Sequence, residues 1–279
     1  MFRIELEKMM TNTVFYFAIF AILMILLAGN IYTSPLTGKE YTVFNVIFAS
    51  EKSNIKSEIC INSFDIIIDG IDSYMDMFLP IIAASPFVVL ICNEKKNSNI
   101  RFEIYRVGKE KYVIEKYLSA MMVGGLVTVI GYAMFCFIIF ITFQGRVSEV
   151  FNYKKEFIFN NDVIAEHMYH LIGISGIYLL KFIKMFFYGA VVVIPAFCMT
   201  MVTKNKYLVL SVPFIMDYFL QILIESIDNV NYKYFLPQVV GNIYMTDYLK
   251  QTVIYGGKII LGLILCKVCV AKKCDCGEG

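Results

Sequence analysis

The fold is decided by the stretch LSAMMVGGLVTVIGYAMFCFIIFITF, residues 118–143, which contains no charged side chain. A helix rises about 1.5 Å per residue and the hydrocarbon core of a bilayer is about 30 Å thick, so about 20 apolar residues cross it. This segment is therefore long enough and apolar enough to span a membrane. It predicts a transmembrane helix.

Further apolar segments lie on both sides of this stretch. Of the whole chain, 58% is hydrophobic and 17% is charged, whereas soluble domains have about 45–50% and about 25%. We therefore predict an all-α polytopic membrane protein whose residues 1–279 form a single transmembrane domain. Its six predicted spans are 13–31, 74–92, 118–143, 185–203, 207–224 and 252–271.

The orientation follows from the distribution of Lys and Arg. With the N-terminus inside, the short inner segments are denser in these residues than the long outer loops, as the positive-inside rule requires. Six spans then place both termini inside, in a cell membrane that we expect to be the bacterial cytoplasmic membrane. The net charge of only +2 gives no reason to expect nucleic acid as a partner.

Short segments at the membrane surface are also predicted. Residues 2–10 place Phe2, Leu6, Met9 and Met10 on one helical face, which predicts an amphipathic interfacial helix; a frayed tail is the alternative. Segment 167–184 is expected to lie in the outer interface, with Lys181 and Lys184 reaching the headgroups. Residues 225–251 form either a re-entrant hairpin or an ordinary outer loop.

The inner loop 93–117 carries the most specific pattern. It contains seven basic and four acidic residues, and Tyr105-Arg106-x-Gly108-x-x-x-Tyr112-x-x-x-Lys116 precedes the long uncharged span. A short helix here would present Tyr105 and Gly108 to a partner before the chain re-enters the membrane. A solvated positive-inside loop is the simpler interpretation of the charges alone.

This layout resembles the permeases of the type-two, or export, family of ABC transporters. The resemblance rests on the N-terminal helix, the six spans, the inner-loop pattern and the Leu236-Pro237 step. It implies that 101–110 is a coupling segment that docks on a separate ATPase, with Arg101, Tyr105, Arg106, Gly108 and Lys109 as contact residues. It also implies a second permease copy or a sister permease, and export of a peptide, lipid or amphiphilic drug. The large polar outer loops and the Lys181/Lys184 pair depart from the family layout.

Motifs for catalysis are absent from the sequence. There is no Gly-x-x-x-x-Gly-Lys-[Ser/Thr] and no Gly-x-Ser-x-Gly, so we expect no enzyme activity and no cofactor on this chain, with ATP bound by the partner. His167 and His170 stand without a second pair of histidines. The thiols of Cys266, Cys269, Cys274 and Cys276 could chemically hold zinc, but their spacing matches no paired knuckle, and we predict no metal site.

Two carboxylates fall inside predicted spans, where an ionisable group is a functional candidate because its insertion is costly. Asp76 lies near the outer end of its span and Asp217 near the middle of the bilayer. Both are candidates for the transport pathway, and a packing role for Asp217 is equally compatible with its position. A secondary transporter is the alternative function, as is an intramembrane enzyme if the two carboxylates meet.

Overall fold

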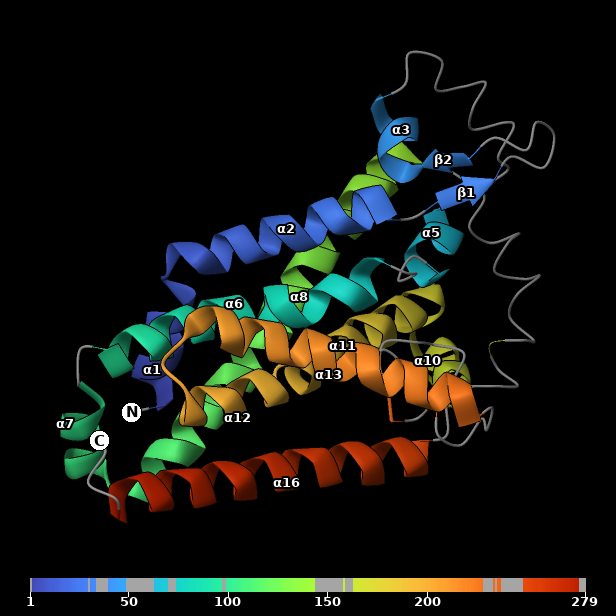
Figure 1. Cartoon of the computed structure of the whole chain (residues 1–279). Helices are drawn as coiled ribbons and strands as arrows, with labels where there is room; N and C mark the ends of the chain where they lie inside the picture. Colours follow the sequence, from blue (N-terminus) through green and yellow to red (C-terminus); the bar gives the residue numbers. More distant parts are fainter. Residues whose placement is uncertain are drawn as a thin grey trace.

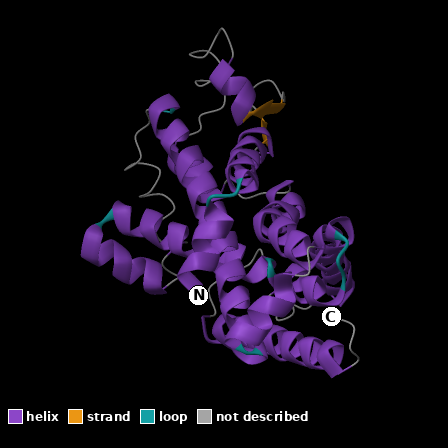
Figure 2. Cartoon of the chain, turned by 90° about the vertical axis from the view of Figure 1, so that its left-hand side faces the viewer, coloured by secondary structure: helices purple, strands orange, loops and turns teal. Residues whose placement is uncertain are grey.

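A computed structural model describes residues 2–29, 31–33, 40–48, 63–69, 74–96, 99–143, 158, 163–227, 233, 235–236 and 248–275. These residues are mostly helical, with short turns between helices and one short antiparallel strand pair among them (Figure 2). The elements, labelled as in Figure 1, are α1 Phe2–Met10, α2 Thr13–Gly29, β1 Ile31–Thr33, β2 Glu40–Thr42, α3 Val43–Phe48, α5 Ser63–Asp69, α6 Tyr74–Lys96, α7 Asn99–Val107, α8 Lys109–Thr142, α10 Val163–Ile172, α11 Ile174–Val192, α12 Ile194–Val202, α13 Lys206–Ile227 and α16 Tyr248–Asp275.

Long apolar helices dominate this structure. Five stretches are long and apolar enough to cross a membrane: Met77–Lys96, Lys109–Thr142, Ile174–Val202, Lys206–Ile224 and Lys250–Cys269. The pair α1 and α2, bent by 61° at its break, makes a sixth if it is counted as one span. The prediction of a helical chain with several membrane-length helices is confirmed, whereas six spans with both termini inside stays a prediction.

Helix α1 has the bounds and the apolar face that the sequence predicts. Met9 is fully buried, and Leu6 and Met10 pack against the core. The chain turns at Asn12, whose side-chain oxygen accepts a hydrogen bond from the backbone N–H of Val14 at 3.1 Å. This local cap explains why the helix breaks here and restarts as α2.

Helix α8 is the central element of the bundle. It packs against α11, α2, α6 and α1, and its closest neighbour is α11. A Cβ atom added to Gly189 would lie 2.1 Å from Thr128 Oγ1 and 2.6 Å from the carbonyl oxygen of Gly124. The two helices therefore approach so closely because glycines face each other at the crossing, as is common between membrane helices.

The helix that corresponds to the fourth predicted span, 185–203, begins earlier in the structure than the sequence predicts. The helical stretch begins at Ile174, directly after Gly173 with φ of 72°, and continues to Val202. Lys181 and Lys184 are both buried in it instead of reaching a headgroup region. Lys181 Nζ donates a hydrogen bond of 3.0 Å to the carbonyl oxygen of Ile68 in α5. This internal acceptor explains why a lysine can lie inside the helix packing.

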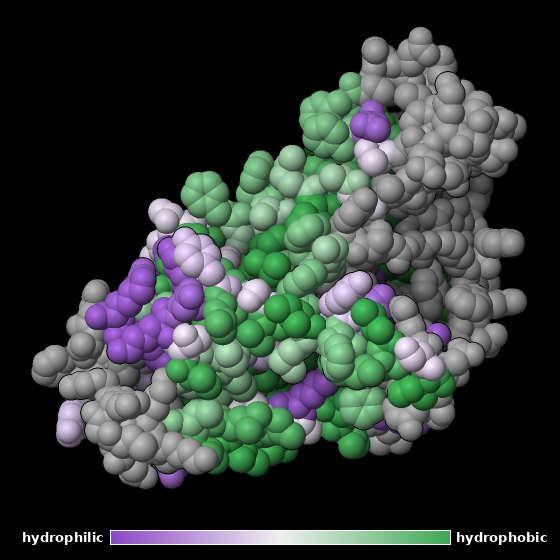
Figure 3. Space-filling view, in the orientation of Figure 1, coloured by the Kyte–Doolittle hydropathy of each residue, from purple (hydrophilic) through white to green (hydrophobic). Residues whose placement is uncertain are grey.

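The long helices run between two ends of the molecule, which we call its poles. Helices α1 and α7 and the C-terminal end of α16 lie at one pole, while β1, β2, α3 and α5 lie toward the other (Figure 1). Apolar side chains cover the middle of the face on which α2, α13 and α16 lie, and hydrophilic side chains gather near α1 (Figure 3). An apolar surface next to a polar end suits a chain that spans a membrane.

Candidate functional site

Four elements meet at the pole that carries α1 and α7. Helix α7 lies between the C-terminal end of α6 and the start of α8, and it packs against both. Helix α1 also packs against α6 and α8. This pole therefore joins the predicted coupling segment to two membrane-length helices.

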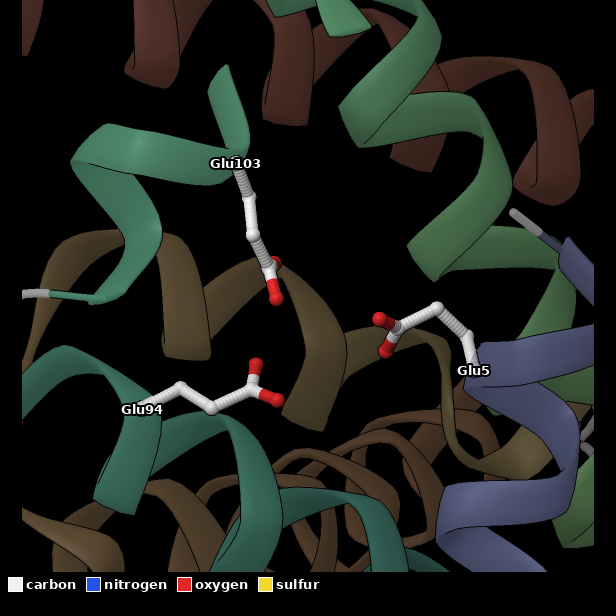
Figure 4. A group of neighbouring side chains, drawn as sticks. All are labelled: Glu5, Glu94 and Glu103. Carbon is white, nitrogen blue, oxygen red and sulfur yellow. The ribbon is translucent and has the colours of Figure 1, made fainter. Parts of the chain in front are cut away.

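Three glutamates from different helices point toward one another inside this junction (Figure 4). They are Glu5 of α1, Glu94 of α6 and Glu103 of α7, and one carboxylate oxygen from each lies within 4.8 Å of the other two. Glu5 and Glu94 are buried, and Glu103 is partly buried. Carboxylate groups this close and this deep repel each other strongly unless positive charge lies among them.

Two lysines supply that charge. The Nζ atom of Lys116 in α8 lies 2.5 Å from Glu5 Oε2, 2.6 Å from Glu94 Oε2 and 3.5 Å from Glu103 Oε2. The Nζ atom of Lys8 lies 2.6 Å from Glu94 Oε1 and 3.6 Å from Glu103 Oε1. We call these five residues the charged junction. It connects α1, α6, α7 and α8 through ion pairs.

The side chain of Lys116 is only 1% exposed, so its charge is almost completely removed from water. Such an ion is tolerated only where its partners replace the lost hydration. Lys8 is nearer to solvent, and its burial lowers the pKa. The hydrogen bond to Glu94 and the charges of Glu94, Glu5 and Glu103 outweigh that effect and raise the pKa of Lys8 above its usual value.

The three carboxylates are also a chemically reasonable ligand set for a hard cation, which prefers oxygen ligands. The sequence analysis predicted no metal site and did not consider these residues together. Two of the carboxylates already contact the Lys116 ammonium group at 2.5–2.6 Å. A metal ion bound here would compete with that ammonium group for the same oxygens.

The residues predicted to contact the ATPase lie on α7 and at the joint between α7 and α8. Tyr105 is 90% exposed, and Arg106 and Lys109 are exposed. Gly108 has φ of 88°, which favours glycine, and it joins α7 to α8. Arg101 lies on α7, but its side chain is outside the described part. Four of the five predicted residues are therefore accessible and lie close together in the chain, next to the charged junction.

The two carboxylates of the predicted spans lie elsewhere. Asp217 is partly buried in α13 and interacts electrostatically with Tyr255 and Lys258 of α16. Lys258 Nζ donates a hydrogen bond of 2.5 Å to the carbonyl oxygen of Phe235. Asp76 is in the first turn of α6, with its side chain outside the described part. The structure therefore gives Asp217 a polar environment and does not test a pairing of the two carboxylates.

The Leu236-Pro237 step is only partly visible, because Pro237 is outside the described residues. Leu236 is buried, and its carbonyl oxygen accepts a hydrogen bond of 2.7 Å from the Tyr255 hydroxyl. With the bond from Lys258 to Phe235, this fixes the segment to α16. The choice between a re-entrant hairpin and an ordinary loop over 225–251 stays open.

A groove of about 650 Å³ opens beside α1 and α2. Its walls are mostly apolar and include Phe15, Ile19, Phe20 and Met134. Among the described residues, Glu7 of α1 is the one charged residue that lines it. Such a surface would contact lipid tails or other amphiphilic molecules at the membrane interface.

No family model matches the chain, and no curated protein matches it with significant similarity.

Proposed function

We propose that the chain is the membrane-spanning permease subunit of an ABC transporter, powered by a separate ATPase subunit that docks on α7. The observation that carries the proposal is the two-sided character of α7. Tyr105 and Arg106 are exposed, while Glu103, which lies on the side of the helix opposite Tyr105, contacts Lys8 and Lys116. A partner that moved α7 would therefore act directly on charges that belong to α1, α6 and α8.

The proposed topology has six spans with both termini in the cytoplasm, in a bacterial cytoplasmic membrane. In this assignment α1 lies along the inner surface and α2 is the first span. The 17 residues of α2 would cover about 25 Å, a little less than the hydrocarbon core. The transporter would contain a second copy of this chain or a sister permease.

The proposed cargo is a peptide, lipid or amphiphilic drug that is exported. Support comes from surfaces that suit molecules with an apolar part: the groove beside Phe15 and Phe20, and the exposed aromatic and aliphatic side chains of α13. Asp217 is a proposed pathway residue because it is an ionisable group on that helix. Asp76 is proposed on its sequence position alone.

The experiment is co-purification of the full chain with the ABC ATPase encoded by the adjacent gene. We expect the wild-type chain to retain the ATPase and Arg106→Glu to reduce the retained amount about tenfold, which corresponds to about 1.4 kcal/mol. Lys204→Glu is the matched control, because Lys204 is an exposed cation in the turn between α12 and α13, and this turn lies at the same pole (Figure 1). The proposal is wrong if the ATPase does not bind, or if both variants bind it equally.

A second variant separates docking from transmission. Gly108→Pro places a residue with φ near −65° at a position with φ of 88°, and so reorients α7 against α8. We expect this variant to lose ATP-driven transport in liposomes while Tyr105 and Arg106 stay on the surface. Undiminished transport by Gly108→Pro would contradict transmission through the α7–α8 joint.

A secondary transporter is the competing function, favoured by the electrostatic interaction between Asp217 and Lys258 within apolar helices. Proton-coupled transport commonly uses such buried ionisable groups. The two functions are distinguished by reconstituting the chain without any ATPase. Uptake driven by a proton gradient and abolished by Asp217→Asn would support the secondary transporter and contradict the ABC permease.

A further inference from the structure

Helix α16 lies unusually close to α8 and α12 around Gly262. A Cβ atom added to this glycine would lie 2.6 Å from Ile194 Cγ2 and 2.9 Å from the hydroxyl oxygen of Tyr117. That hydroxyl donates a hydrogen bond of 3.0 Å to the carbonyl oxygen of Ile259. The missing side chain and the tyrosine bond together hold the backbone of α16 against its neighbours.

This close approach brings two cysteines from different helices together. Cys266, one turn beyond Gly262, lies with its Sγ atom 3.5 Å from Sγ of Cys198 in α12. Cys198 Sγ also donates a weak hydrogen bond of 3.6 Å to the carbonyl oxygen of Gly262. Both thiols are free; Cys266 is fully buried and Cys198 is partly exposed.

We propose that Cys198 and Cys266 are an oxidisable thiol pair that forms a disulfide between α12 and α16 on contact with a small thiol oxidant. A disulfide bond is about 2.05 Å long, so the two sulfur atoms have to approach by about 1.5 Å. Since the helices already touch and the thiols already face each other, side-chain rotation with a small helix shift provides this movement. Neither partner has to leave its helix.

The difference in exposure gives the two thiols different roles. With a low-molecular-weight disulfide as oxidant, the thiolate of Cys198 attacks one sulfur, forms a mixed disulfide and releases one small thiol. The thiolate of Cys266 then attacks the Cys198 sulfur and releases the second small thiol. The protein loses two electrons and two protons, and the oxidant is reduced to two thiols.

The product would join α12 to α16 covalently at a crossing where the contacts among the described residues include the packing of Gly262 against Ile194 and the weak hydrogen bond from Cys198 to Gly262. These helices belong to two different candidate spans. Relative movement of the two spans would be restricted in the oxidised form and free in the reduced form. The thiol pair and its oxidation do not depend on the proposed transport function.

The experiment uses the purified full-length protein in detergent. It is treated with diamide, an azo compound that takes up two electrons and two protons to become a hydrazine, and the remaining thiols are then blocked with N-ethylmaleimide. Proteolysis and mass spectrometry identify the linked peptides. We expect the 198–266 peptide pair to be the main cross-link, to form independently of protein concentration and to disappear on reduction.

Single substitutions test the assignment. Cys198→Ser and Cys266→Ser should each remove the cross-link, whereas Cys269→Ser, one turn further along α16, should retain it. Oxidation should also raise the thermal unfolding midpoint of the wild-type protein and of Cys269→Ser, but not that of Cys198→Ser, because the bond closes a long loop.

Two results would overturn the proposal. One is complete labelling of Cys198 and Cys266 by N-ethylmaleimide under conditions that oxidise other cysteines of the same chain. The other is equal pairing of Cys198 with Cys269, which would mean that the 3.5 Å contact does not select the partner.

Discussion

Replacing Lys116 by methionine tests the charged junction most directly. Methionine keeps the length and apolar stem of lysine but removes the ammonium group that contacts Glu5 at 2.5 Å and Glu94 at 2.6 Å. In the wild-type junction three carboxylates face two ammonium groups. In Lys116→Met three carboxylates face Lys8 alone, in a site where Glu5 and Glu94 are buried.

The magnitude follows from the least costly response of the variant, which is to protonate one carboxylate. For a carboxylic acid with a pKa of about 4.3, protonation at pH 7.3 costs about 4 kcal/mol, since each pH unit is worth about 1.4 kcal/mol. This agrees with the 3–5 kcal/mol typical of breaking a buried ion pair. We therefore expect Lys116→Met to lower the free energy of unfolding by about 4 kcal/mol at pH 7.3 and by about 1.4 kcal/mol at pH 5.3.

The assay is unfolding in mixed micelles by a denaturing detergent, followed by circular dichroism at both pH values. Arg3→Met is the matched control, because Arg3 contacts Glu7 at 2.9 Å with side chains 89% and 60% exposed. An exposed pair is worth less than about 1 kcal/mol, with little change between these pH values. Adding Glu5→Gln to Lys116→Met should recover part of the lost stability.

The reasoning would be refuted if Lys116→Met were as stable as Arg3→Met at pH 7.3. It would also be refuted if the loss at pH 5.3 equalled the loss at pH 7.3, because the destabilisation would then come from packing and not from uncompensated charge.

Two further predictions concern stability. The pKa of Lys8 is raised above 10.5 in the folded state. Its contribution to the free energy of unfolding is therefore present below pH 10.5 and is lost as the pH rises through the folded-state pKa. Unfolding measured over an alkaline pH series should show this extra loss of stability in the wild type but not in Lys8→Met. Gly189→Ala should lower the free energy of unfolding by about 1–3 kcal/mol, because the new methyl group would lie 2.1 Å from Thr128 Oγ1. Gly256→Ala, which meets nothing within 4 Å, should be neutral or stabilising by up to about 1 kcal/mol, and equal effects in the two glycine variants would contradict the packing argument.

Much of the helical architecture could be predicted from the sequence, because the signal is local. The uncharged stretch 118–143 by itself predicts a membrane-length helix. The spacing of Leu6, Met9 and Met10 predicts the buried face of α1. The starts of helices were less predictable. Charged residues lower the hydropathy of two segments, Lys109–Tyr117 and Ile174–Lys184, so the predicted spans exclude them. In the structure the helices continue through both segments.

The charged junction was missed for a different reason. Glu5 is far in the chain from Glu94, Glu103 and Lys116, and each of these residues alone looks like an ordinary charge beside a predicted span. Only the packing of α1 against α6 and α8 brings them together. The one hint in the sequence is that Glu94 and Lys116, which have opposite charges, lie at the two ends of the inner loop 93–117. The exposed Tyr105 of α7 could be predicted from the sequence, whereas the contacts of Glu103 with Lys8 and Lys116 could not, because they depend on how the helices pack.

The absence of proline from α8 has a mechanical consequence. Its 34 residues form one continuous helix, about 51 Å long, whereas prolines interrupt the interiors of α6 and α13. A long helix with an unbroken ladder of backbone hydrogen bonds resists bending, and proline sites are where helices kink. A push delivered near its first turns should therefore tilt α8 as a stiff rod, with α6 and α13 flexing around it. In the proposed topology its far end would swing in the opposite direction.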